Sequence, residues 1–105
     1  MKNEHLGEFE ALILAALLRL EPNAYGVSIR REIEQCTERN VSIGAVYTTL
    51  NRLEKKHMVR SVLGTPTASR GGRAKRYYQA RPEGRLALER TVAALNRMTE
   101  GLMPL

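Results

Sequence analysis

Residues 42–56 read SIGAVYTTLNRLEKK, and a basic segment, SRGGRAKR, follows at residues 69–76 after a short apolar run. In the first segment, apolar side chains recur at spacings of three and four residues, which predicts a helix with one buried stripe. That stripe comprises Ile43, Val46, Leu50 and Leu53. The opposite, outward face then carries Ala45, Thr48, Thr49, Arg52 and Lys56. Small hydroxyl groups and cations on an exposed helix face suit a DNA groove, so we predict a recognition helix followed by a charged loop.

The positive charge of the chain is concentrated in one block. Seventeen Lys and Arg residues against eleven Asp and Glu residues give the 105-residue chain a net charge of +6. Residues 52–90 hold eleven cations and three anions, a local charge of +8, which leaves −2 for the remainder. A basic block beside a mildly acidic remainder indicates a polyanionic partner such as nucleic acid. A basic surplus also keeps proteins soluble, and charge alone does not separate the two interpretations.

Several classes of protein are excluded by what the sequence lacks. Cys36 is the only cysteine and there are two histidines, so the chain has neither an internal disulfide nor four metal ligands of this kind. No nucleophile with a paired base, carboxylate pair or phosphate loop is evident, and we expect neither an enzyme nor a cofactor. The apolar run at residues 11–18 is too short to span a membrane, and Glu8 and Glu10 precede it instead of the cations of a signal peptide. We expect a cytoplasmic protein.

The order of the expected elements defines a fold class. Periodicity predicts helices at residues 9–20, from residue 25 to about 36, and at 43–56, where Ser42 is a good N-cap. Residues 59–63 and 74–80 fit strands of an antiparallel hairpin, joined by a segment rich in turn formers. Pro82 begins a last helix that can run to about residue 102. The sequence therefore predicts a mainly α (α+β) fold: a winged helix-turn-helix domain over residues 1–81 and a C-terminal dimerisation helix over 82–105, in one compact domain overall.

The last helix carries an apolar seam that a small core does not cover. Its apolar residues are spaced four, three, three and four apart, and the first helix is apolar around most of its circumference. A second copy of the chain could cover both surfaces. We therefore predict a homodimer whose interface includes Leu14, Leu18, Leu88, Val92, Leu95, Met98 and Leu102.

Five short motifs stand in one register along the chain. They are YG at residues 25–26, GAVY at 44–47, LNRLE at 50–54, GGRAKRYY at 71–78 and PEGR at 82–85. In order and spacing they resemble the PadR family of bacterial transcriptional regulators, over about residues 8–90. The resemblance implies a winged helix-turn-helix repressor that forms a homodimer through its last helix, binds pseudo-palindromic operators and is released by small molecules. The single short C-terminal helix resembles the small subgroup of the family.

Two positions depart from the family pattern. Thr48 stands where relatives often have proline, which removes a rigid element and adds a hydrogen-bonding group. Arg81 stands where relatives usually have threonine, so a side-chain cap worth about 1 kcal/mol is lost before the last helix.

The DNA contacts are divided between reading bases and holding phosphates. Hydroxyl and guanidinium groups can read base edges in the major groove, and we predict Thr48, Thr49 and Arg52 as the base readers. Asn51 is also available, but beside buried Leu50 we favour a solvated surface role for it. Lysine and arginine side chains supply affinity rather than sequence information. The remaining predicted DNA-contacting residues are Ser42, Tyr47, Lys55, Lys56, Arg70, Arg73, Lys75 and Arg76.

Strand alternation places Tyr77 and Tyr78 on opposite faces of the hairpin, so one is expected to pack in the core and the other at its edge.

Two alternatives stay open at the level of sequence. Besides a DNA-binding repressor, the chain could be a winged-helix module whose basic wing binds an acidic protein partner. A small hydrophobic effector could bind at the dimer interface, in a pocket lined by Phe9, Leu14, Met98 and Met103, although a dry, fully packed interface fits the same residues.

Overall fold

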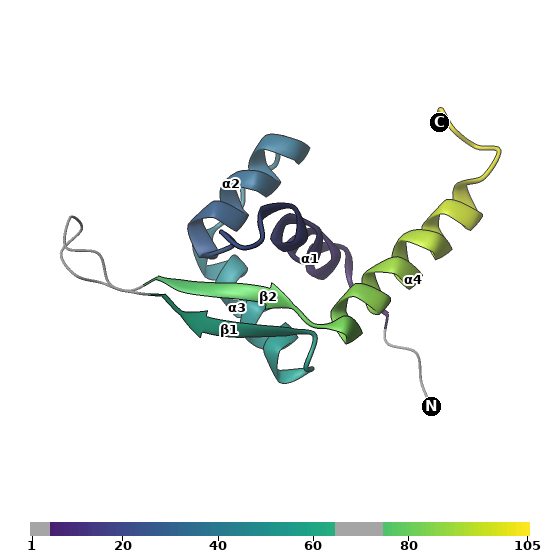
Figure 1. Ribbon diagram of the computed structural model, residues 1–105. Helices are drawn as coiled ribbons and strands as arrows, with labels where there is room; N and C mark the ends of the chain where they lie inside the picture. Colours follow the sequence, from purple (N-terminus) through teal and green to yellow (C-terminus); the bar gives the residue numbers. More distant parts are fainter. Residues whose placement is uncertain (1–4, 65–74) are drawn as a thin grey trace.

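The chain folds into four helices and one two-stranded sheet. A computed structural model describes residues 5–64 and 75–105. The elements follow in the order α1 (Glu8–Leu20), α2 (Gly26–Thr37), α3 (Ile43–Lys55), β1 (Val59–Leu63), β2 (Arg76–Ala80) and α4 (Pro82–Thr99) (Figure 1). The predicted winged helix-turn-helix with a C-terminal helix is therefore confirmed. β2 begins later, and α4 ends three residues earlier, than the sequence patterns predict.

Helix α1 is the centre of the molecule. It contacts α2, α3, α4 and β2, and the core side chains Ile13, Leu14 and Leu17 have no exposed surface. Because Leu14 lies wholly within the core of its own chain, its assignment to a dimer interface is wrong. The helix is apolar on most sides because elements of the same chain surround it, whereas Leu18 keeps part of its surface exposed.

The hairpin pairs its strands in antiparallel register, with Val59 opposite Ala80 and Ser61 opposite Tyr78. Tyr78 is buried, and its backbone N–H donates to the carbonyl oxygen of Ala24 at 2.8 Å. Tyr77 lies on the other face and meets the ring of Tyr25 edge to face, with centroids 5.8 Å apart. The two adjacent tyrosines thus have different roles, as strand alternation predicts.

Helix α3 has defined ends. The Ser42 hydroxyl accepts from the Ala45 backbone N–H at 3.1 Å, which confirms the predicted N-cap. At the other end His57 has a φ of 61°, and the N–H of Met58 donates to the Leu53 carbonyl at 2.9 Å. This six-residue closure ends the helix and turns the chain into β1.

Helix α4 begins against the base of the hairpin and then leaves the rest of the molecule. The Met58 carbonyl accepts from the Arg81 N–H at 2.9 Å, and a Cβ built on Gly84 would lie 2.3 Å from the same oxygen. Gly84 and Ala87 are buried, whereas the later turns extend away from the helical cluster, on the side opposite the Leu63 end of the hairpin (Figure 1). Within the described residues, no helix combines the length and apolarity needed to cross a bilayer.

Candidate nucleic-acid interface

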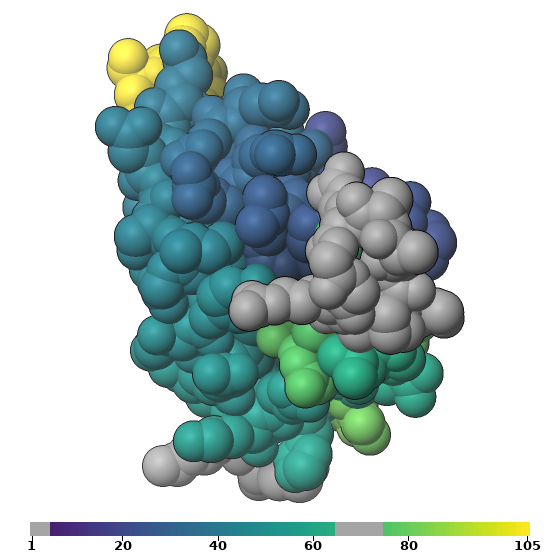
Figure 2. Space-filling model, turned by 90° about the vertical axis from the view of Figure 1, so that its left-hand side faces the viewer, coloured from purple at the N-terminus to yellow at the C-terminus, as the bar shows by residue number. Residues whose placement is uncertain are grey.

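The side of α3 that faces away from the core is lined by small and polar residues. Val46, Leu50 and Leu53 are fully buried, and the residues on the opposite side of the helix are all exposed. The outermost row is Gly44, Thr48, Asn51 and Lys55. Figure 2 shows one side of the molecule, on which the teal surface of the α3 part of the chain lies beside the green residues of the hairpin. An exposed helix edge of this composition suits insertion into a groove of DNA.

The prediction that Thr49 points outward is wrong. Its residue surface is only 4% exposed, because it lies on the same side of the helix as Val46 and Leu53. The buried side of α3 is wider than the buried stripe predicted from its apolar residues alone, because a threonine methyl group can also pack in a core. Thr48 remains exposed, and Asn51, which the sequence pattern left as a surface residue, lies in the middle of the outward row.

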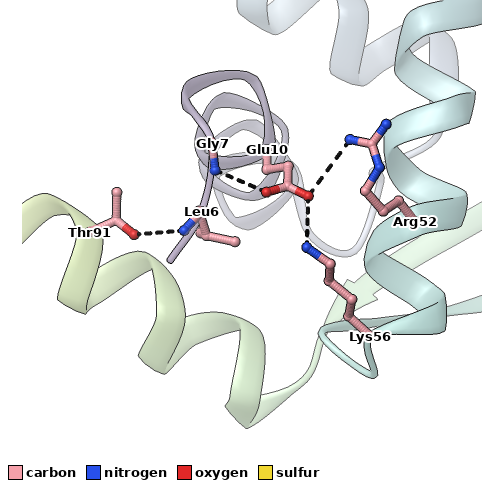
Figure 3. Close-up of polar contacts among 6 residues, drawn as sticks. All are labelled: Leu6, Gly7, Glu10, Arg52, Lys56 and Thr91. Atoms are coloured by element: carbon pink, nitrogen blue, oxygen red, sulfur yellow. Dashed lines mark hydrogen bonds and ion pairs between the residues drawn. The ribbon is translucent and has the colours of Figure 1, made fainter. Parts of the chain in front are cut away.

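Arg52 and Lys56 lie on the flank of α3 that faces α1, where both meet the carboxylate of Glu10. Glu10 Oε2 is 3.3 Å from Lys56 Nζ and 3.7 Å from Arg52 Nη1, and Oε1 accepts from the Gly7 N–H at 2.9 Å (Figure 3). Burial by itself raises the pKa of Glu10, but the Gly7 hydrogen bond and the two cations outweigh burial and hold the pKa below its ordinary value. Sequence reasoning missed this contact, which joins residues 46 positions apart.

The opposite flank of α3 is tied to the hairpin. Arg76 Nη1 donates to Ser61 Oγ at 3.0 Å, and Ser61 Oγ donates to Glu54 Oε2 at 2.9 Å. Lys75 Nζ lies 4.3 Å from the centroid of the Tyr25 ring, a cation–π contact. The two predicted wing cations within the described residues therefore both have partners in the same chain.

Arg70 and Arg73, the other predicted wing cations, lie outside the described residues. Among the predicted phosphate contacts in residues 5–64 and 75–105, Lys55 is exposed and makes no ion pair.

Tyr47 sets the distance between α2 and α3. A Cβ built on Gly26, the first residue of α2, would lie 2.4 Å from the Tyr47 ring, so only glycine fits beneath the ring as it stands. The ring is partly exposed beside a groove of about 700 Å3 between α3 and the hairpin, which Asn51 and Glu54 also line. Tyr47 thus combines packing against Gly26 with a partly exposed surface position.

The outer half of α4 presents its apolar residues to solvent. Leu95 is 60% exposed and Met98 is 77% exposed, and Val92 is also exposed, while Leu88 is half-buried against the core. Leu102 is exposed as well, but it lies beyond the end of α4. A second groove, of about 560 Å3, lies between the start of α1 and α4, where Leu6, Leu12 and Leu95 line it.

The expected effector pocket is not reproduced in one chain. Leu14 is in the core, and Phe9, Met98 and Met103 do not line the groove between α1 and α4. No cluster of three His, Cys, Asp or Glu side chains that could hold a metal occurs in the described part of the chain.

This arrangement of a helix-turn-helix, an adjoining β-hairpin and a terminal helix is that of a winged helix-turn-helix transcriptional regulator. The model of the transcriptional regulator PadR-like family matches residues 13–90, and the chain belongs to that family. The resemblance found in the sequence motifs is therefore confirmed, and with it DNA-binding transcription regulation as the general role. Members of the family are regulators rather than enzymes.

Solved structures share the fold. A PadR family transcription regulator from hypervirulent Clostridium difficile R20291 is 28% identical, with a TM-score of 0.72 over 92% of this chain and 95% of the other. A PadR-like transcriptional regulator from Bacillus cereus is 23% identical, with a TM-score of 0.71 over 90% and 86%. A transcriptional regulator from Clostridium thermocellum is 21% identical, with a TM-score of 0.70 over 89% and 87%. Comparison with curated proteins gives no match.

Proposed function

We propose that this PadR-like regulator is a repressor that binds a pseudo-palindromic operator as a homodimer. In this proposal α3 enters the major groove, residues 1–81 form the DNA-binding domain, and residues 82–105 join two copies. The observation that carries the proposal is the two-sided character of α3. One side is closed by the core, and the other exposes Thr48, Asn51 and Lys55 beside the cationic end of the hairpin.

Base reading is assigned to the outward row of α3 and its flank. The Thr48 hydroxyl can donate or accept, the Asn51 amide can pair with an adenine edge, and the Arg52 guanidinium can grip guanine with two hydrogen bonds. Lys55, Lys56, Lys75 and Arg76 are assigned to phosphates, together with Tyr47, Ser42 and the wing residues Arg70 and Arg73. Phosphate contacts hold the protein on the duplex but do not select its sequence.

Dimerisation is supported by the exposed seam on α4. Large apolar side chains at positions 92, 95 and 98 of α4, and at position 102 just after the helix, are exposed in a single chain, and a second copy that packs against them would remove that surface from water. Each copy would then carry one α3, and the two-fold symmetry of the pair matches two half-sites in inverted orientation.

In this proposal a small hydrophobic effector releases the protein from DNA. The groove between α1 and α4 is mainly apolar and adjoins the α4 seam, so a small hydrophobic molecule bound there would lie at the edge of the proposed dimer interface.

Selection of duplexes from a random-sequence pool by the full-length protein tests the function. We expect enrichment of an inverted repeat whose half-site centres are about one helical turn, or a multiple of it, apart. Affinity for the enriched duplex should fall about a thousandfold between roughly 50 mM and 200 mM salt, the size expected for about six phosphate contacts.

Failure to enrich any sequence would contradict sequence-specific binding. Charge reversal of Lys75 and Arg76 that leaves DNA affinity unchanged would instead favour a wing that binds an acidic protein. Sedimentation at micromolar concentration that shows only monomer would contradict the dimer.

A further inference from the structure

Glu10 places a negative charge beside cations that are assigned to DNA contact, where it would oppose the binding of a polyanion. It lies in the first turn of α1, its side chain is only 9% exposed, and it faces the flank of α3 rather than solvent (Figure 3). A partly buried carboxylate is costly unless hydrogen bonds and opposite charges compensate it, and Glu10 has both.

The partners of Glu10 are two of the cations assigned to DNA. Its Oε2 atom is 3.3 Å from Lys56 Nζ and 3.7 Å from Arg52 Nη1, one turn apart on α3. The hydrogen bond from the Gly7 N–H to Oε1 fixes the carboxylate from the other side. These contacts hold the Glu10 carboxylate towards α3, and they keep both cations beside α1.

The ion pairs of Glu10 with Arg52 and with Lys56 differ in length and in exposure. The Arg52 side chain is 52% exposed and its ion pair is the longer one, so its guanidinium can still reach outward from a constrained position. The Lys56 side chain is 34% exposed and makes the shorter contact, so its charge is more fully neutralised by Glu10.

We propose that Glu10 is a positioning residue for DNA recognition, which orients Arg52 for base contact and restrains Lys56 from indiscriminate phosphate contact. The inference rests on the proposed function. It assigns to α1 an indirect influence on sequence preference, through Arg52 and Lys56, although no residue of α1 is expected to touch DNA.

The physical consequence concerns sequence-independent binding. A cation that is paired with Glu10 must give up this ion pair when it contacts a phosphate. Once Glu10 is neutral, the same cation can contact the phosphate without losing an ion pair. Neutralising Glu10 should add up to about two phosphate contacts, and each should steepen the dependence of log K on log salt by about 0.9.

The test compares Glu10→Gln with Glu32→Gln. Both variants raise the net charge by one, and both remove a carboxylate that pairs across elements. Glu10 loses its pairs with Arg52 and Lys56, and Glu32 of α2 loses its pair with Arg19 of α1, in which Oε2 meets Nε at 2.6 Å. The glutamine at position 10 can still accept from the Gly7 N–H. Binding of each full-length variant is measured by titration across a salt series, on one random-sequence duplex and on the duplex enriched by the wild-type protein.

For Glu10→Gln we expect about tenfold tighter binding to the random duplex, a steeper salt dependence, and a fall of about tenfold in the preference for the enriched duplex. Glu32→Gln should show only the small, uniform gain that one unit of charge gives. Equal behaviour of the two variants, in either the salt slope or the preference, would overturn the proposal.

A second variant covers the case in which Glu10→Gln fails to fold. Lys56→Met keeps the side-chain stem and removes the charge that Glu10 restrains. It should reduce random-duplex affinity by less than Lys55→Met, because Lys55 makes no ion pair within the described residues. The reverse order would overturn the proposal.

Failure of the proposed function is recognised separately, because it appears as a wild-type protein that enriches no sequence. In that case the salt slopes on the random duplex still decide whether Glu10 restrains the cations.

Discussion

Helices α3 and α4 have similar apolar periodicity, but their apolar sides have different surroundings. On α3 the side chains of Val46, Leu50 and Leu53 are fully buried by the same chain, whereas on α4 Leu95 and Met98 are largely exposed. The difference arises because α1, α2 and β1 all pack against α3, whereas the buried residues of α4, Gly84 and Ala87, lie in its first turns. Periodicity thus predicts which side of a helix is apolar, and the surrounding elements decide whether that side needs a partner.

Truncation of one leucine on each helix should give the largest difference in the free energy of unfolding. Leu50→Ala opens a cavity in the core and should lower the free energy of unfolding by about 2–5 kcal/mol. Leu95→Ala removes an exposed side chain and should change the stability of the monomer by about 0.5 kcal/mol or less, while it weakens self-association. Urea denaturation of dilute protein and sedimentation at micromolar concentration measure the two effects. A large loss of monomer stability in Leu95→Ala would show that the outer half of α4 packs within its own chain.

Glycine substitutions test how firmly each helix is held by backbone contact. A Cβ at Gly84 would meet the Met58 carbonyl oxygen, so Gly84→Ala should cost about 1–3 kcal/mol as α4 shifts. A Cβ at Gly44 of α3 would meet no atom within 4 Å in the described residues, apart from the local helix backbone, so Gly44→Ala should stabilise by up to about 1 kcal/mol through helix propensity. Thermal unfolding of the two variants and the wild-type protein measures both changes in stability. Destabilisation by Gly44→Ala together with tolerance of Gly84→Ala would contradict the described packing.

Substitutions of two adjacent threonines on α3, exposed Thr48 and buried Thr49, test where the outward side of the helix ends. Thr48→Val removes an exposed hydroxyl and should reduce the preference for an enriched duplex by about fivefold, the worth of one hydrogen bond of about 1 kcal/mol. Thr49→Val keeps the shape of a buried side chain and should leave that preference unchanged. Competition binding against random duplex measures both. If Thr49→Val alone lost the preference, the outward face of α3 would have to include position 49.

Acid should weaken the attachment of α3 to α1 before it affects α4, and this is the smallest expected effect. The pKa of Glu10 lies below its ordinary value of 4.5 in the folded protein, so the ionised carboxylate stabilises the fold at pH values above 4.5. This stabilisation is lost as the pH falls through the lowered folded-state pKa. Glu10→Gln should therefore lose less stability than the wild-type protein between pH 5 and pH 3, measured by urea denaturation. Parallel losses would mean that the Glu10 contacts contribute nothing to the folded state.

Local signals in the sequence predict the elements and several of their ends. The Ser42 cap, the end of α3 near His57 and the division between Tyr77 and Tyr78 follow from short-range chemistry, and the structure confirms each. Thr49 and Leu14 are different, because their burial depends on how wide the packed side of a helix becomes once neighbours surround it.

The contact of Glu10 with α3 could not be predicted from the sequence. It depends on the angle at which α1 crosses α3, and the carboxylate and Lys56 are separated by 46 positions in the chain. The motif that contains Lys56 indicates a cation near DNA, but nothing near it in the sequence indicates an internal anion. The candidate site is therefore predictable as a list of outward residues and not as a set of ion pairs.

The contact of Gly84 and Arg81 with the Met58 carbonyl also fixes a geometry beyond the single chain. Because backbone atoms make the contact, the direction of α4 is set at the same peptide group that begins the hairpin, and it does not depend on the identity of the side chains farther along α4. In the proposed dimer the separation of the two α3 helices, counted in base pairs of operator, would depend on that angle as well as on how the two α4 helices pack. The half-site spacing that a pair can read is then set partly at the base of the hairpin, far from the residues that join the two copies.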